Sequence, residues 1–256
     1  MTKIQALHRA YSHRDCELKP MLWQSLGQGF NFIEADIYCF LGQIFVAHDL
    51  QQLRPWHTLE KRYLEPLQTY LQQNQMRLYT DDTPLWLFLD VKTPADSSYQ
   101  TIHKKLKTYS HILTCYEGGS LHQGQINIIL SGNRLSYENF SRLPIRYAAL
   151  DGRAEDLGKN TNPHIMPIIS DDWRKHFSWQ GQGEMPIEEE KKLNEMLELA
   201  HQHGQKLRFW ATHDQPDLAR TKLWDKLLTA GIDLVNTDDV TGLASYLKDK
   251  ALTNNC

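Results

Sequence analysis

Phe32-Ile33-Glu34-Ala35-Asp36-Ile37-Tyr38 is the stretch from which the fold can be worked out. Apolar and acidic side chains alternate along it, and the side chains of a β-strand alternate between its two faces, so Glu34 and Asp36 point the same way. Two carboxylates about 4 Å apart repel each other by roughly 4 kcal/mol at an effective dielectric near 20. A divalent cation would offset this repulsion because hard cations take oxygen ligands. Two acids at a solvent-facing strand end would need no cation, and the stretch alone leaves both interpretations open.

Short apolar runs recur along the whole chain, and helical patterns separate most of them. The runs are residues 4–7, 32–38, 44–47, 86–92, 126–130, 147–150, 165–169, 207–210 and 232–235. The helical patterns are residues 21–26, 58–73, 98–113, 187–203, 217–230 and 240–248. Continuous apolar runs that alternate with helices indicate a parallel sheet, and about eight such units match a (β/α)8 barrel. We predict an α/β fold, a TIM-type (β/α)8 barrel formed by residues 1–256 as a single domain; a doubly wound open sheet is the alternative.

Composition and charge exclude several classes of protein. The net charge of −3 argues against a surface that binds nucleic acid. No apolar run approaches the roughly 18 residues of a membrane span, and residues 4–7 are too short for the core of a signal peptide. We therefore expect a cytoplasmic protein, or a secreted one if a signal has been removed. The four cysteines have no metal-binding spacing, and the sequence carries no signal of the oligomeric state.

Polar side chains near the ends of the first predicted strands form the candidate site, because the carboxyl ends of barrel strands meet at the face where active sites lie. The converging residues are His8, Glu34, Asp36, His48, Asp90 and Lys92. Three carboxylates suit Mg²⁺ or Ca²⁺ better than Zn²⁺. Two imidazoles can exchange protons near neutral pH, and a lysine can hold an anion. These groups are the ones needed to cleave a phosphodiester.

The order and spacing of several motifs resemble a known superfamily over nearly the whole chain. The motifs are His8-Arg9-Ala10-Tyr11, IEADIY (33–38), VAHD (46–49), LFLDVKT (87–93), SGNR (131–134), YAALDGR (147–153), ISDDW (169–173), RFWATHD (208–214) and GIDLVNTDD (231–239). The chain resembles the phosphatidylinositol-specific phospholipase C-like phosphodiesterases, which include glycerophosphodiester phosphodiesterases. It looks closest to the bacterial and fungal branch named for "altered inheritance of mitochondria".

This resemblance implies a fold, a reaction and roles for individual residues. It implies a TIM-like barrel and a metal-dependent phosphodiesterase that acts on a glycerophosphodiester or a phospholipid headgroup, either by hydrolysis or by transfer to a cyclic phosphate. His8 and His48 would be the catalytic pair, and Lys92 would contact the phosphate. Glu34, Asp36 and Asp90 would bind the metal. One departure is that the branch usually has His-Asn-Asp-Tyr at the first histidine, where this chain has His8-Arg9-Ala10-Tyr11.

Residues after later strands are weaker candidates. Arg134 could bind phosphate or form a structural ion pair, and Trp210 could stack on a headgroup or pack at the rim. His13 falls in a predicted loop, where a solvated side chain is the plainer expectation. Residues 172–179 mix aromatic and basic side chains, which fits either a lid that touches a lipid surface or a loop pinned by its aromatics.

Two other functions fit parts of the pattern. A catalytically inactive barrel could bind a phosphorylated ligand or a lipid surface, although such a protein has no need of two histidines beside three carboxylates. Paired carboxylates also serve glycoside hydrolysis, which would not depend on metal. The sequence contains no nucleophile elbow and no phosphate-binding loop of the Gly-Lys-Ser/Thr type.

Overall fold

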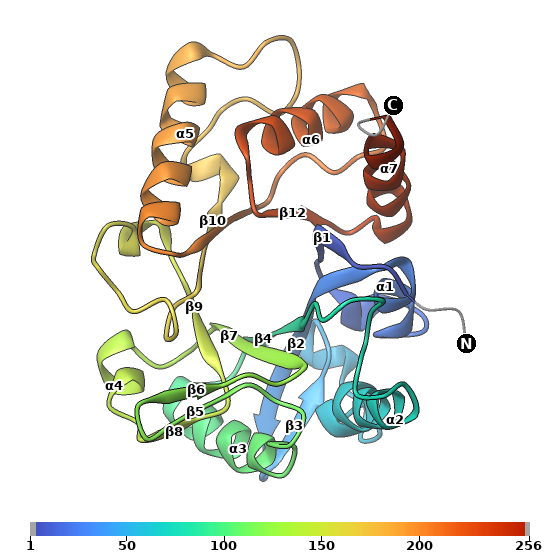
Figure 1. Ribbon diagram of the computed structural model, residues 1–256, viewed down its shortest axis with the longest axis vertical. Coiled ribbons are helices and arrows are strands. Elements are labelled where there is room, and N and C mark those ends of the chain that lie inside the picture. Colours follow the sequence, from blue (N-terminus) through green and yellow to red (C-terminus); the bar gives the residue numbers. More distant parts are fainter. Residues whose placement is uncertain (1–3, 254–256) are drawn as a thin grey trace.

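Eight parallel strands close into a barrel with helices on its outside, as predicted (Figure 1). The computed structural model describes residues 4–253. The barrel strands are β1 (Leu7–Ser12), β2 (Phe30–Phe40), β4 (Leu85–Val91), β7 (Ile126–Gly132), β9 (Ala149–Gly152), β10 (Ile168–Asp172), β11 (Lys206–Trp210) and β12 (Leu234–Thr237). They follow one another in sequence order, and pairing of β1 with both β12 and β2 closes the ring.

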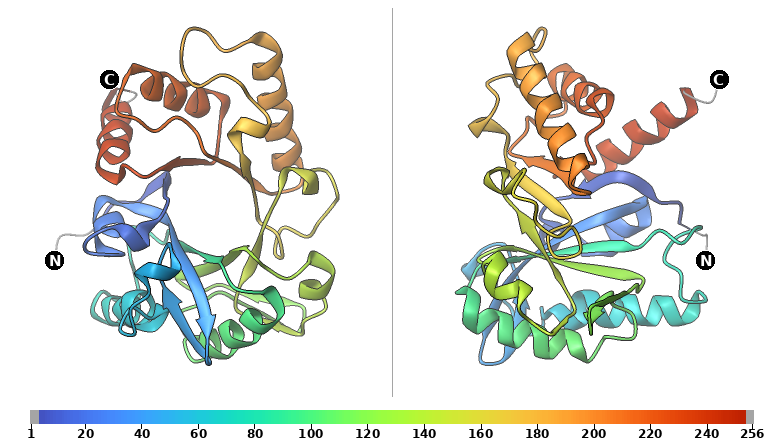
Figure 2. Two further views of the ribbon diagram at one scale, coloured as in Figure 1. Left: turned by 180° about the vertical axis from the view of Figure 1, so that it is seen from behind. Right: turned by 60° about the vertical axis from the view of Figure 1, so that its left-hand side comes forward.

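Helices connect most of these strands and surround the ring (Figure 2). They are α1 (Trp23–Gln28), α2 (Glu65–Gln73), α3 (Ala95–Lys107), α4 (Tyr137–Ser141), α5 (Ile187–Gln202), α6 (Leu218–Ala230) and α7 (Val240–Thr253). A π-helical turn, η3 (Glu60–Leu64), precedes α2. Helix α6 matches its predicted range because Asp217 caps its first turn and Gly231, with φ of 91°, ends it.

Two local predictions were wrong. The first barrel strand is Leu7–Ser12 and not residues 4–7. The run at residues 44–47 became β3 (Gln43–Val46), which pairs antiparallel with β2 outside the ring, because the Leu41-Gly42 turn reverses the chain. The connection from β9 to β10, for which no helix was predicted, contains a 3₁₀ turn, η4 (Ala154–Asp156).

A second, smaller sheet covers part of the amino-terminal mouth of the barrel. Its strands are β5 (Cys115–Glu117), β6 (Ser120–His122) and β8 (Ile145–Arg146). The barrel interior is filled by one apolar cluster, which is separate from the larger core between the strands and the helices. The interior cluster comprises Tyr11, Phe32, Phe88, Ile129, Ile168 and Leu234. This layer makes the barrel a packed core and forms the floor beneath the polar groups at its carboxyl end.

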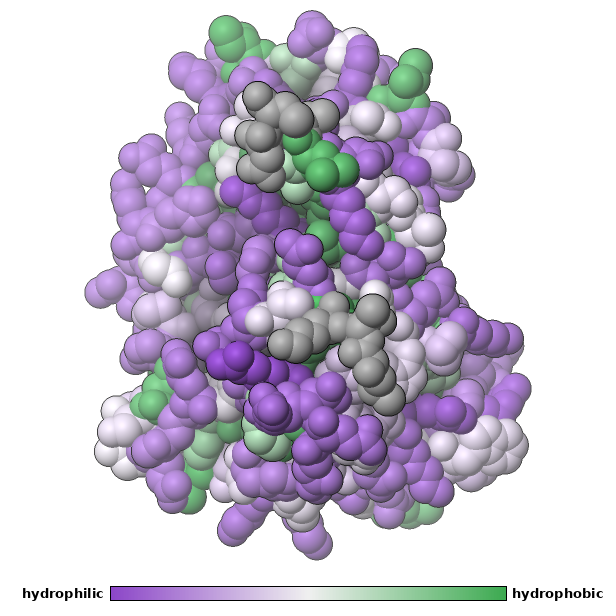
Figure 3. Space-filling model, turned by 45° about the vertical axis from the view of Figure 1, so that its right-hand side comes forward, coloured by the Kyte–Doolittle hydropathy of each residue, from purple (hydrophilic) through white to green (hydrophobic). Residues whose placement is uncertain are grey.

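No helix within residues 4–253 is long and apolar enough to cross a bilayer. The face in Figure 3 is mostly hydrophilic, with apolar residues in small separate patches. The aromatic loop after β10 is pinned, because Trp173, Phe177 and Trp179 are all buried. This loop therefore does not present its aromatics as a lid or a lipid-binding patch.

Candidate active site

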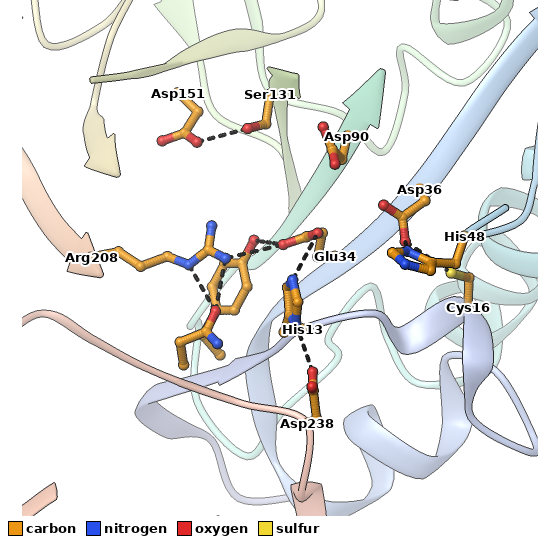
Figure 4. Close-up of polar contacts among 12 residues, drawn as sticks. His13, Cys16, Glu34, Asp36, His48, Asp90, Ser131, Asp151, Arg208 and Asp238 are labelled. Carbon is orange, nitrogen blue, oxygen red and sulfur yellow. Dashed lines mark hydrogen bonds and ion pairs between the residues drawn. The ribbon is translucent and has the colours of Figure 1, made fainter. Parts of the chain in front are cut away.

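A cavity of about 290 Å³ opens at the carboxyl ends of the barrel strands. Its lining residues are His13, Arg14, Glu34, Asp36, His48, Asp90, Lys92, Ser131, Asp151, Arg153, Arg208 and Trp210. Nearly all are charged or able to hydrogen-bond, so the cavity suits a small, highly polar ligand. Figure 4 shows the central group of these side chains and their contacts.

Strand register brings three carboxylates together. Glu34 and Asp36 lie two residues apart on β2, and Asp36 pairs directly with Asp90 on β4. Each of the three carboxylates offers an oxygen within 4.8 Å of the other two. Glu34 and Asp36 are buried, and Asp90 is partly exposed toward the cavity. The predicted cluster of acids is therefore present, on neighbouring strands.

The two oxygens of Glu34 have different surroundings. Tyr11 donates a 2.5 Å hydrogen bond to Oε2, and Arg208 Nη2 lies 3.2 Å from the same oxygen. The Arg208 guanidinium stacks on the Tyr11 ring at 3.6 Å and also donates to Asn236. Oε1 is 3.8 Å from His13 Nε2. Glu34 is thus held firmly through one oxygen, and the other oxygen remains directed at the cavity.

Lys92 lies between the other two acids. Its Nζ is 2.7 Å from Asp36 Oδ1 and 2.5 Å from Asp90 Oδ2. Burial raises the pKa of Asp36, but Lys92 and hydrogen bonds from Cys16 and His48 outweigh burial and hold this pKa below its usual value. Burial, followed by the charge of Glu34, raises the pKa of Asp90 despite the nearby lysine. One lysine therefore does not fully balance the negative charge of the cluster.

This donor set fits a hard divalent cation. Three carboxylate oxygens from two rigid strands match the ligands of Mg²⁺ or Ca²⁺. Gly132, at the end of β7, has φ of +64°, and a Cβ there would overlap Asp90 Oδ1 and the Val91 carbonyl oxygen. Glycine at position 132 therefore leaves space for the Asp90 carboxylate, and any other residue type would fill that space. Glu34, Asp36 and Asp90 are the residues that would hold the cation.

Two histidines flank the carboxylates, and each lies against an acid (Figure 4). His48 Nδ1 is 3.2 Å from Asp36 Oδ2. His13 Nδ1 is 2.6 Å from Asp238 Oδ1, which directs Nε2 toward Glu34 and the cavity. Burial lowers the pKa of His13, but Glu34 and Asp238 outweigh it and raise the pKa above its usual value. Such acid contacts fix the tautomer and orientation of an imidazole.

Residues at the end of the last strand, β12, hold Asp238 in its contact with His13. The Asp238 backbone N–H and the Thr237 hydroxyl donate to Asp214, so Asp238 is held in place after β12. His13 follows β1 directly, and its own backbone N–H donates to the Thr237 carbonyl. The contact between His13 and Asp238 therefore spans the seam between the first and last strands of the barrel.

Four cationic side chains line the cavity, and three of them are ion-paired. Lys92 contacts Asp36 and Asp90, Arg208 contacts Glu34, and Arg153 lies 3.1 Å from Asp151. Arg14 makes no ion pair with any residue in 4–253, and it adopts a left-handed conformation, with φ of 51° and ψ of 40°. A guanidinium with no carboxylate partner is the lining group with the most capacity to bind a phosphate.

The structure corrects two of the predicted site residues. His8 lies near the start of β1, with Nε2 3.9 Å from Asp81, which precedes β4. It therefore sits toward the amino-terminal end of the barrel, and His13 occupies the position in the cavity that was predicted for His8. Arg134 donates to the Asp151 carbonyl and lies 3.8 Å from Asp156, so it braces β9 and does not line the cavity.

The remaining predicted residues lie where they were expected. The cavity includes His48, Glu34, Asp36, Asp90, Lys92 and Trp210. Five other lining residues were not predicted from the sequence, namely Arg14, Ser131, Asp151, Arg153 and Arg208; nor was Asp238, which contacts His13. Ser131 and Asp151 directly follow apolar runs, and Arg208 lies within one, which was the signal available in the sequence.

Comparisons with known proteins point to one family. Residues 2–143 match the model of the AIM6-like phosphodiesterase domain. The chain is 25% identical to altered inheritance of mitochondria protein 6 of Eremothecium gossypii, over 95% of this chain and 70% of that protein. It is also 25% identical to the homolog of that protein from Arthroderma benhamiae, over 87% of this chain and 76% of the relative. No solved structure matches.

Proposed function

Because the chain belongs to the AIM6-like phosphodiesterase domain family, we propose that it is a metal-dependent phosphodiesterase that uses His13 and His48 as its acid–base pair. The observation that carries this proposal is the arrangement of three carboxylates with one histidine on each side, each against an acid. Such a cluster supplies a cation site and two proton-transfer groups within one cavity of about 290 Å³.

The roles of the residues follow from their positions. A cation held by Glu34, Asp36 and Asp90 would neutralise charge that develops on the phosphate oxygens. One imidazole removes a proton from the attacking hydroxyl, and the other gives a proton to the leaving oxygen. Arg14 and Lys92 hold the phosphate by charge. Asp238 keeps His13 Nε2 facing the cavity, and Trp210 borders the space for the headgroup.

The substrate class that we propose is a glycerophosphodiester or a phospholipid headgroup. The attacking group is either water, which gives a phosphomonoester, or a neighbouring hydroxyl of the substrate, which gives a cyclic phosphate. The family relationship and the polar walls of the cavity support a small phosphodiester in either case. Phosphorus NMR of the products separates the two reactions, because a cyclic phosphate and a phosphomonoester have different chemical shifts.

A panel of phosphodiesters tests this function. We expect turnover with Mg²⁺ or Ca²⁺, none with EDTA, and a loss of about 10²- to 10⁴-fold in kcat for His13→Ala and for His48→Ala. His8→Ala is the matched control, since His8 lies outside the cavity, and should keep its turnover. Turnover that ignores EDTA would exclude the cation site. A folded protein that binds the cation and cleaves nothing in the panel would favour a barrel that only binds a phosphorylated ligand.

A further inference from the structure

Asp15 is a buried acid that lies outside the cavity. Its exposed fraction is 0%, and no lysine, arginine or histidine in residues 4–253 forms an ion pair with it. Burial raises the pKa of this carboxyl although three hydrogen bonds oppose the shift. Burying an acid without a counter-charge is costly, so its hydrogen-bond partners are the place to look for its role.

Three donors from two parts of the chain, the start of α1 and the turn η3, converge on Asp15. The Leu22 backbone N–H donates to Oδ2 at 2.6 Å, the Tyr63 hydroxyl donates to Oδ2 at 2.7 Å, and the Ser25 hydroxyl donates to Oδ1. Ser25 belongs to α1, and Tyr63 is a fully buried residue of the π-helical turn η3. Asp15 therefore fastens the loop after β1 to two helical elements that pack outside the barrel.

The loop needs this fastening because its backbone is strained on both sides of Asp15. Arg14 has φ of 51°, and Leu22 has φ of 64° with ψ of −56°. Residues other than glycine in such regions are strained and persist only where their surroundings hold them. The strained Leu22 is the residue whose N–H Asp15 accepts.

The neighbours of Asp15 in sequence reach the proposed active site. His13 and Arg14 line the cavity, and the Cys16 thiol donates to Asp36 Oδ2 at 3.2 Å. A displacement of about 1 Å in a catalytic group can reduce the rate about 100-fold. We propose that Asp15 is a positioning residue that sets the placement of His13 and Arg14 by holding the 13–22 loop through its acceptor oxygens. This inference rests on the phosphodiesterase function proposed above.

Substitutions at Asp15 separate its geometry from its charge. Asp15→Ala removes all three hydrogen bonds, and we expect kcat to fall 10- to 100-fold and the amides of residues 13–22 to exchange faster with deuterium. Asp15→Asn keeps an oxygen for Leu22 and Tyr63, while its amide can donate to Ser25, whose hydroxyl can turn to Ser12 at 2.8 Å. We expect Asp15→Asn to retain kcat within about threefold, since no charge is required.

Asp233→Ala is the matched control. Asp233 accepts the Leu207 backbone N–H and contacts His201, but it lies at the amino-terminal end of the barrel. It should lower stability without changing kcat per folded molecule. The proposal is overturned if Asp15→Ala behaves like this control. It is also overturned if Asp15→Asn loses as much activity as Asp15→Ala, because the charge and not the acceptor geometry would then be what matters.

Two more variants complete the test. If Asp15→Ala does not fold, Tyr63→Phe removes one donor and keeps the packing, and we expect a 3- to 10-fold loss of kcat with faster exchange in the loop. An unchanged kcat for Tyr63→Phe would overturn the proposal. Full activity of His13→Ala would reject the proposed catalytic pair, whereas an inactive His13→Ala beside a fully active Asp15→Ala would reject only the positioning role.

Discussion

Gly132 shows how closely one backbone position controls the carboxylate cluster. A methyl group at this residue would overlap Asp90 Oδ1 and the Val91 carbonyl oxygen, and its φ of +64° disfavours any other residue. We expect Gly132→Ala to push the Asp90 carboxylate aside and to weaken Mg²⁺ or Ca²⁺ binding at least 10-fold. Calorimetric titration of the cation measures this effect directly, without a substrate.

Gly27→Ala is the control for that substitution. Gly27 lies in α1, and a Cβ there would meet no atom within 4 Å. We expect this variant to bind the cation as the original chain does. Equal cation affinity in Gly27→Ala and Gly132→Ala would mean that Asp90 is not a ligand, or that it moves freely.

The positions of the three carboxylates were predicted correctly from the sequence, but one histidine was misplaced. The alternation of β2 puts Glu34 and Asp36 on one face, and that inference depends only on local geometry. The choice of His8 failed because the first strand ends at Ser12, so the residue that enters the cavity is His13. His13-Arg14-Asp15 keeps the histidine and the aspartate of the family pattern His-Asn-Asp-Tyr, and this match was the signal that could have found it.

Asp171 is one of two ionised side chains that hold the turn after β10, η5 (Trp173–Lys175), the other being its N-cap Asp172. Asp171 lies 3.0 Å from Lys175 Nζ and 3.1 Å from His176 Nε2, and it accepts the Asp172 backbone N–H. Burial raises the pKa of Asp171, but these contacts outweigh burial and hold the pKa below its usual value. The ionised form is therefore the one that the folded protein favours.

We expect Asp171→Asn to lower the free energy of unfolding by about 1–2 kcal/mol at pH 7. A lowered pKa contributes stability above the ordinary value near pH 4, and this stability is lost as the pH falls through the lowered value. The deficit of the variant should therefore shrink at pH 3, as measured by urea denaturation at both pH values. A deficit of equal size at pH 7 and pH 3 would contradict the role of the charge. Asp82→Asn is the control, since that carboxylate is 76% exposed.

Elements with strong local signals were predictable, and elements defined by distant partners were not. The capping residue Asp217 and the terminal Gly231 marked α6. The strand β3 has an apolar pattern that suits a barrel strand, and only its pairing with β2 shows that it runs antiparallel outside the ring. The wall residues Asp151 and Arg208 lie on strands whose neighbours are set by closure of the barrel.

The apolar layer inside the barrel supports the acidic cluster at the carboxyl ends of the strands. Phe88 is fully buried and packs edge-to-face against Tyr11 at 4.9 Å, and Tyr11 in turn donates to Glu34. We expect Phe88→Ala to cost about 3–5 kcal/mol of stability and to weaken cation binding, because the floor beneath Glu34 loosens. Thermal denaturation and cation titration of the same sample test both effects.

Phe40→Ala provides a comparison for that prediction. Phe40 is 41% exposed at the end of β2 and stacks only loosely on Tyr38, with ring centroids 6.1 Å apart. Its removal should change stability much less than the removal of Phe88. A Phe88→Ala variant that binds the cation normally despite its lower stability would show that the interior layer and the acid cluster are independent.

The hydrogen bond between His13 and Asp238 joins residues 225 positions apart. Such a contact must wait until almost the entire chain has emerged and the ring has closed, because distant pairings form only after the intervening loop entropy has been overcome. Helices and neighbouring strand pairs can form earlier without it. If His13 acts as proposed, a chain becomes active only late in folding, and partly folded chains already carry the three acids on β2 and β4 before His13 is directed at them.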